Sequence, residues 1–147
     1  MYKVVVAEGK QLFSVIRDTA FQPKYVVQYI PGQWTVPAVV GTRLFCFKWL
    51  ANAIAFVASI PNEDAPVLDI WHCRAQEIKA TGWVSGGDFE AFWDANASLN
   101  AHCYRIAPKG TYMAGSVKLT RPVSPYRQKL SLFFSKIIRV YPRVVKP

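Results

Sequence analysis

The last third of this chain lacks acidic residues. All nine Asp and Glu residues lie at or before Asp94, whereas ten of the 18 Lys and Arg residues follow it. Residues 95–147 therefore carry a formal charge of +10 and the preceding residues −1, which together give the net charge of +9. Because an excess of positive charge speeds association with anionic surfaces, the sequence predicts an acidic partner: a protein surface, nucleic acid or a lipid headgroup layer.

Cysteine is also scarce, and the three residues are Cys46, Cys73 and Cys103. Their number is odd and no two have the C-x-x-C spacing, which excludes a disulfide framework. Such cysteine usage is typical of a reducing compartment, so the sequence predicts a cytoplasmic location.

Long hydrophobic runs are absent. The stretch from Leu44 to Ile60 is interrupted by Lys48 and Asn52, which leaves it short of the roughly 20 residues that a membrane-spanning helix needs. The N-terminal apolar stretch ends at Glu8 and is too short for a signal peptide. With 52% hydrophobic and 14% aromatic residues, the chain is expected to form one globular domain.

Catalytic and phosphate-binding motifs are missing too. There is no G-x-x-x-x-G-K-[ST] sequence, and the glycines from Gly82 to Gly87 lack the G-x-G-x-x-G spacing. A His-Cys pair occurs twice, as His72-Cys73 and His102-Cys103. Two such pairs could supply the four ligands of a zinc site, or a thiol nucleophile and its base, but adjacent residues on a strand point to opposite faces. The sequence therefore predicts a non-enzymatic protein with no metal or cofactor, and a small enzyme with a His/Cys site is the second alternative.

Hydrophobic patterning predicts an α+β fold, with a small, mainly antiparallel sheet, two packed helices and a basic amphipathic C-terminal helix. A hairpin is expected from residues 2–7 and 11–16, and a second from 102–106 and 112–119. Further strands are expected at 24–30, 43–47 and 67–75, an irregular loop at 33–42, and helices at 50–60 and 88–95. Pro31 and Gly32 are placed as in a type II turn.

The clearest pattern is a helical stripe near the C-terminus, formed by Leu130, Phe133, Phe134, Ile137, Ile138 and Tyr141. Ser124-Pro125 predicts the start of this helix, and Pro142 predicts its end. The predicted organisation is a domain over 1–121 and a basic extension over 122–147. Expected partner-binding residues are the charges Lys129, Lys136, Arg139 and Arg143 and the apolar anchors Phe133, Phe134, Ile137 and Ile138.

Three roles are open for this helix: packing on its own domain, docking on an acidic protein surface in a larger assembly, and binding a membrane surface, the least favoured. Nucleic-acid binding is the main alternative function. Aromatic and basic residues that fit it are interleaved at Tyr104, Arg105, Tyr112, Lys118, Arg121, Tyr126 and Arg127. No RNP, KH or helix-turn-helix sequence accompanies them.

A set of turn and aromatic positions between residues 2 and 80 carries a resemblance. It consists of Val27-Gln28-Tyr29-Ile30-Pro31-Gly32-Gln33-Trp34, Pro37, Leu44-Phe45-Cys46-Phe47 and Ile70-Trp71-His72-Cys73. In these positions the chain resembles a small uncharacterised domain of bacteriophage and bacterial reading frames. The resemblance implies a phage origin and carries no catalytic motif. Together with the basic end, it favours a structural or assembly protein of a virion that docks through its C-terminal helix.

Overall fold

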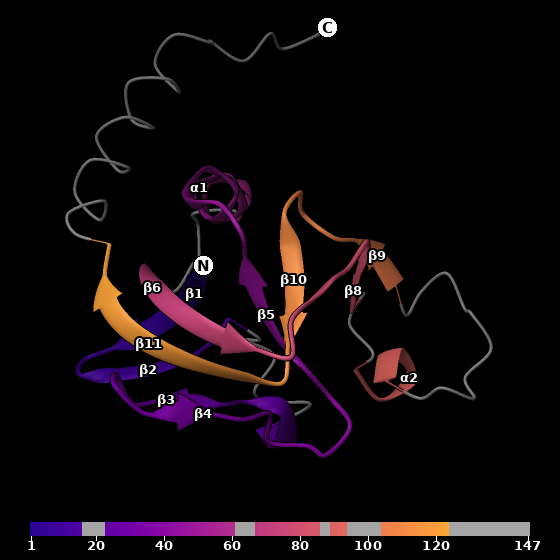
Figure 1. Cartoon of the computed structure of the whole chain (residues 1–147), viewed down its shortest axis with the longest axis horizontal. Coiled ribbons are helices and arrows are strands. Elements are labelled where there is room, and N and C mark those ends of the chain that lie inside the picture. The colour runs from indigo at the N-terminus through magenta and orange to yellow at the C-terminus, as the bar shows by residue number, and fades with distance from the viewer. Residues whose placement is uncertain (16–22, 61–66, 86–88, 94–103, 124–147) are drawn as a thin grey trace, which may run out of the picture.

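The computed structural model describes residues 1–15, 23–60, 67–85, 89–93 and 104–123. In these residues the chain forms a nine-stranded antiparallel sheet, a separate two-stranded sheet and two short α-helices (Figure 1). The elements are β1 (Tyr2–Glu8), β2 (Gln11–Ser14), a 3-10 helix (Pro23–Tyr25), β3 (Gln28–Tyr29), β4 (Trp34–Thr35), β5 (Leu44–Phe47), α1 (Leu50–Ser59), β6 (Leu68–Gln76), β7 (Lys79–Ala80), β8 (Trp83–Ser85), α2 (Phe89–Trp93), β9 (Tyr104–Ile106), β10 (Thr111–Ala114) and β11 (Ser116–Pro122). The expected mainly antiparallel sheet with two helices is confirmed.

The first hairpin is confirmed. β1 and β2 pair antiparallel, with Val5 opposite Ser14 and Glu8 opposite Gln11. Gly9 in the turn has φ 61°, a conformation that glycine adopts without a steric penalty. The turn at Pro31 and Gly32 is confirmed as well, since Gly32 has φ 84° and the N–H of Gln33 donates to the carbonyl of Ile30 at 3.0 Å.

Strand β1 lies near the middle of the large sheet, whose order is β4-β11-β6-β1-β5-β10-β7. On one side β1 pairs with β6 from Tyr2 to Val6. Its other edge is shared, because Tyr2 lies opposite Phe47 of β5 whereas the pairing from Val5 onward is with β2. The sheet therefore forks beside Lys3 and Val4.

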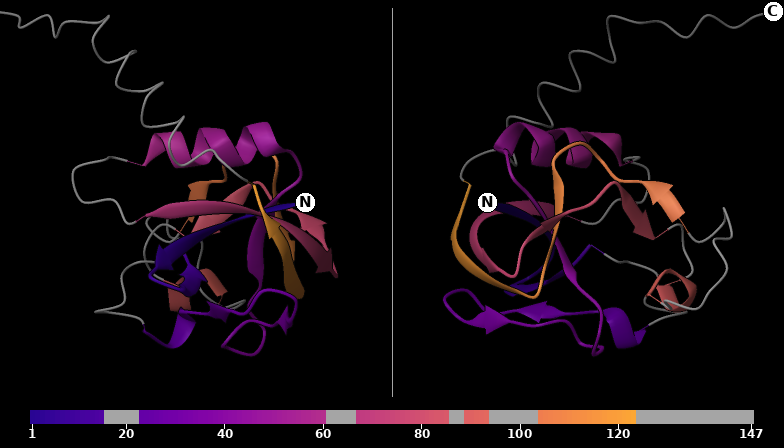
Figure 2. Two further views of the ribbon diagram at one scale, coloured as in Figure 1. Left: turned by 90° about the vertical axis from the view of Figure 1, so that its left-hand side faces the viewer. Right: turned by 45° about the vertical axis from the view of Figure 1, so that its right-hand side comes forward.

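The sheet has a hydrophobic cluster on each face. On one face, α1 packs over Val4, Phe47 and Ile70, and Ala53 of the helix is fully buried there. On the other face, Val5 packs with Leu12, Val27, Tyr29, Leu44, Cys46, Cys73, Ala114, Val117 and Leu119. Figure 2 shows the resulting layers, with α1 along one side of the strands and β3 and β4 along the other.

Helix α1 forms where the apolar spacing predicts it. Leu50, Ile54 and Val57 pack against the sheet with Ala53. The helix ends at Ser59, two residues before Pro61, whose ring cannot continue a helix. No helix in the described part of the chain is long and apolar enough to cross a membrane.

The expected hairpin between 102–106 and 112–119 is wrong. β9 pairs with β8, and the residues expected to form its partner make two strands that are separated by Gly115. β10 pairs with β5 and β7, whereas β11 pairs with β6 and β4. These distant partners bury Val117 and Leu119 completely, which outweighs the shorter loop of a local hairpin.

Two segments of the first half also differ from expectation. The strand expected at 24–30 is a 3-10 helix followed by the two-residue β3. In the expected loop at 33–42, Trp34 and Thr35 form β4, because β11 offers them an edge to pair with. Both β3 and β4 depend on pairing with strands that are distant in the chain, so the local sequence pattern did not predict them.

The expected C-terminal helix lies outside the described residues. Their last part is β11, which continues to Pro122. The N–H of Val123 donates to the carbonyl of Ile70 at 2.8 Å, and its side chain packs against the cluster under α1. The described fold thus includes Val123.

Candidate functional site

All eight residues expected to bind a partner lie outside the described residues: Lys129, Phe133, Phe134, Lys136, Ile137, Ile138, Arg139 and Arg143. The same holds for His102 and Cys103. Of the residues expected to contact nucleic acid, Arg105 lies on β9, Tyr112 on β10, and Lys118 and Arg121 on β11.

The pair His72-Cys73 does not form a site, because its two side chains lie on opposite faces of β6. The ring of His72 contacts that of Tyr2, with centroids 5.0 Å apart. Cys73 is buried in the other cluster, and this burial raises the pKa of its thiol to about 12. A thiol with this pKa stays protonated and unreactive at neutral pH. Among the described residues, no three His, Cys, Asp or Glu side chains are grouped as metal ligands.

A row of side chains crosses the outer surface of three neighbouring strands. The register of β11 puts Lys118 opposite Trp34 of β4 on one side and opposite Arg74 of β6 on the other. Cross-strand neighbours project from the same face of a sheet, so the three side chains lie next to one another. Trp34 is 44% exposed and Arg74 is also exposed. The indole and the Arg74 guanidinium are therefore open to solvent, whereas Lys118 is half-buried.

A second row runs beside the first. Arg121 of β11 lies opposite His72 of β6, and His72 lies opposite Tyr2 of β1. An irregularity in β11 between Leu119 and Arg121 shifts the register and brings Arg121 to this position. We refer to the six residues of both rows as the basic face: Tyr2, Trp34, His72, Arg74, Lys118 and Arg121.

The cations of the basic face have no acidic partner among the described residues. The two ion pairs there are Lys24–Glu90 and Arg43–Glu77, which lie elsewhere. Lys118 and Arg74 are instead direct cross-strand neighbours, an arrangement that destabilises a sheet because like charges repel. Partial burial lowers the pKa of His72 below 6.5, and the charges of Arg121 and the N-terminal amino group lower it further. An anion bound on this face would relieve the repulsion.

A second feature is a cavity of about 500 Å³ at the fork of the sheet. Its lining includes Lys3 and Val4 of β1, Leu44 of β5, Val27 before β3 and Tyr29 of β3. Lys3 is only 5% exposed, and burial lowers the pKa of its amine. The cavity and the basic face are separate, since none of the residues of the basic face lines the cavity.

Comparisons with protein-family models, curated proteins and solved structures found no match. The basic face and the cavity are therefore interpreted from their own geometry. Both regions present cations that have no carboxylate partner among the described residues, Lys118 and Arg74 on the basic face and Lys3 in the cavity. This chemistry is suited to binding anions.

Sequence reasoning identified two of the six residues of the basic face as contacts to nucleic acid. Lys118 and Arg121 were expected as contacts to nucleic acid, whereas Trp34 and Arg74 were not. Trp34 precedes Lys118 by 84 residues, and nothing in the local sequence of either residue signals their pairing. The sequence signal that could have linked them was a tryptophan in an expected loop, Trp34, together with a basic strand without acidic residues, β11.

Proposed function

We propose that this protein is a non-enzymatic nucleic-acid-binding module that binds single strands on its basic face. The observation that carries the proposal is the position of Lys118 between Trp34 and Arg74 on adjacent strands. Surfaces that bind single strands combine cations along the phosphate backbone with aromatic side chains on which bases stack. The row supplies both elements on one face.

The indole of Trp34 is the stacking platform. It is 44% exposed, and its cross-strand neighbour Lys118 is placed to contact the phosphate next to a stacked base. Arg74 and Arg121 extend the positive charge toward Tyr2 and His72, whose rings contact each other and are a second candidate for stacking. A strand of nucleic acid laid across β4, β11 and β6 meets the ring of Trp34 first and then the cations Lys118 and Arg74.

The acid-free end of the chain adds to this charge. Residues 124–147 follow β11 directly and contain six Lys and Arg residues and no Asp or Glu. Sequence-independent affinity for nucleic acid depends on the number of cations that neutralise phosphates. We expect the extension to strengthen binding without adding base preference.

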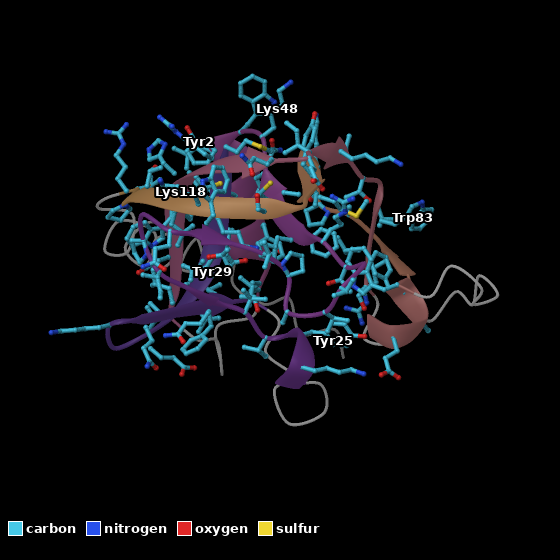
Figure 3. All side chains as sticks on the ribbon, turned by 60° about the horizontal axis from the view of Figure 1, so that its bottom comes forward. Tyr2, Tyr25, Tyr29, Lys48, Trp83 and Lys118 are labelled. Atoms are coloured by element: carbon cyan, nitrogen blue, oxygen red, sulfur yellow. The ribbon has the colours of Figure 1, made fainter. Side chains whose placement is uncertain are left out.

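The test is fluorescence anisotropy with labelled single-stranded oligothymidine of about 20 nucleotides, longer than the site of about 4–16 nucleotides typical of one such domain. Trp34→Ala is expected to weaken binding by about 5-fold to 100-fold, the equivalent of one lost stacking contact. The control is Trp83→Ala. Trp83 is 54% exposed but lies on β8, away from Tyr2 and Lys118 (Figure 3).

A competitor distinguishes nucleic acid from other anions. Polyglutamate of matched charge has no bases, so it is expected to displace oligothymidine poorly from the wild-type protein and better from Trp34→Ala. Equal binding by Trp34→Ala, Trp83→Ala and the wild type would refute stacking on this face. Efficient displacement by polyglutamate from all three would assign the face to an acidic protein instead.

The second candidate is assembly on an acidic protein surface, as a component of a phage virion. The apolar stripe from Leu130 to Tyr141 favours it, because nucleic acid offers no counterpart to such a stripe. A chain that ends at Val123 is expected to stay folded and to sediment as a monomer, whereas the full chain joins a larger particle. Unchanged sedimentation of the particle after this truncation would exclude docking through the extension.

A further inference from the structure

The cavity at the fork of the sheet is mostly apolar. Val4 and Phe47 line it from the side of α1, and Val27 and Leu44 from the opposite face of the sheet. It lies beside Lys3, where the neighbour of β1 changes from β5 to β2. Its volume of about 500 Å³ lies in the range of small-molecule sites, about 300–1,000 Å³.

Most hydroxyl groups of the lining are already occupied. The side chain of Ser14 accepts the N–H of Val27 at 3.1 Å. Thr42 donates to the carbonyl of Val39 at 2.7 Å, and Thr111 to that of Pro108 at 2.6 Å. These hydrogen bonds complete the fold, and they use the hydroxyl protons of Thr42 and Thr111.

Tyr29 is different. It is 2% exposed and lines the cavity, and its hydroxyl has no hydrogen-bond partner in the described part of the chain. A buried hydroxyl without a partner destabilises a protein, so such a group is typically satisfied by a water or a ligand. Because burial raises the pKa of Tyr29, the hydroxyl keeps its proton and is a hydrogen-bond donor at neutral pH.

Lys3 lies beside this hydroxyl-bearing ring. Its Nζ is 5.4 Å from the centroid of the Tyr29 ring and donates one hydrogen bond, at 2.6 Å, to the carbonyl of Phe45. An ammonium group has three donors, and neither ion pair of the described residues involves Lys3. Buried charges in proteins are usually paired, and within the described residues Lys3 has no carboxylate partner.

We propose that the cavity binds an apolar monocarboxylate, such as a medium-chain fatty acid, whose carboxylate contacts Lys3 and Tyr29. Burial lowers the pKa of Lys3, and a bound carboxylate would favour the charged ammonium again because opposite charges attract. The phenol supplies a second donor. The hydrocarbon tail lies against the aliphatic and aromatic walls formed by Val4, Val27, Leu44 and Phe47. Among the residues that the structure describes, no Asp or Glu lines the cavity, and Arg105 in its lining adds a further positive charge. The charge of the lining thus favours an acid over an alcohol or an amine with the same tail.

Calorimetric titration with dodecanoate, dodecan-1-ol and dodecylamine, all below their aggregation limits, tests this assignment. The wild type is expected to bind dodecanoate at least tenfold more tightly than the alcohol and to bind the amine weakest. Tyr29→Phe keeps the ring and removes the unpartnered hydroxyl, so it is expected to weaken dodecanoate about tenfold and to leave the alcohol unchanged. Tyr112→Phe, at a tyrosine outside the lining, is the matched control and is expected to bind as the wild type.

Lys3→Met is the second variant, since methionine keeps an unbranched apolar side chain of similar length. It is expected to bind acid and alcohol equally. If circular dichroism shows that Lys3→Met does not fold, the affinity of Tyr29→Phe for dodecanoate is the deciding measurement. Equal affinity of the wild type for acid and alcohol, absence of dodecanoate binding, or wild-type affinity in Tyr29→Phe would overturn the proposal. None of these outcomes bears on nucleic-acid binding, because the basic face shares no residue with the cavity.

Discussion

The charges of the basic face have a measurable signature in the salt dependence of binding. The perturbation is the triple substitution of Arg74, Lys118 and Arg121 by Gln, three cations that lie on adjacent strands without a carboxylate partner in the described structure. If each neutralises one phosphate of a single strand, each contributes about 0.7 to the slope of log affinity against log salt, and the three together about 2. A rise in salt from about 50 to about 200 mM should then weaken the wild type about 16-fold more than the variant.

The assay is oligothymidine anisotropy at several salt concentrations, with a control of equal charge. The control variant substitutes Gln for Lys10, Lys79 and Lys109, which are exposed and lie outside the basic face. Both variants have the same net charge, so a long-range effect of charge alone would change their slopes equally. Equal slopes in the two variants would refute the contact of the face with phosphates, and a lower slope only in the Arg74, Lys118 and Arg121 variant would support it.

Two further predictions concern the fold beneath this face. Leu119→Ala truncates a core side chain that is 0% exposed, so it is expected to lower the free energy of unfolding, measured in urea, by about 2–5 kcal/mol. The control is Val40→Ala, at a side chain that is 101% exposed, which should change the free energy of unfolding by less than about 0.5 kcal/mol. The lowered pKa of His72 makes the unfolded chain bind a proton more readily than the folded chain, so stability decreases as the pH falls through 6.5. His72→Gln should reduce this loss between pH 7.5 and 5.5, and an identical pH profile in the variant would contradict the assignment.

Elements with local signals were predictable from the sequence. The turn around Gly9, the apolar spacing of Leu50 to Val57 and the alternation along Leu68 to Cys73 each contain their own signal, and the first hairpin, α1 and β6 follow them. The separation of β10 from β11 at Gly115 was not predictable in this way. The pairing of Met113 with Phe45 and of Val117 with Ala75 depends on partners distant in the chain.

The same limit applies to the two candidate sites. Lys118 and Arg121 stand out because no acidic residue is near them in the sequence, but the register that adds Trp34 and Arg74 is a tertiary property. Lys3 looks like an ordinary charge at the start of a strand. Only the fork between β5 and β2 buries it beside Tyr29, and a fork has no signature in the spacing of apolar residues.

The central place of β1 has a consequence for biosynthesis. This strand leaves the ribosome before its partner β6 and the next strand, β11, are made. Until then the hairpin of β1 and β2 has an open edge with Val4, Val5 and Val6, and such edges recruit other extended chains. We expect the nascent protein to collapse into its sheet late and slowly, and to depend on chaperones that shield the hairpin until the remaining strands emerge.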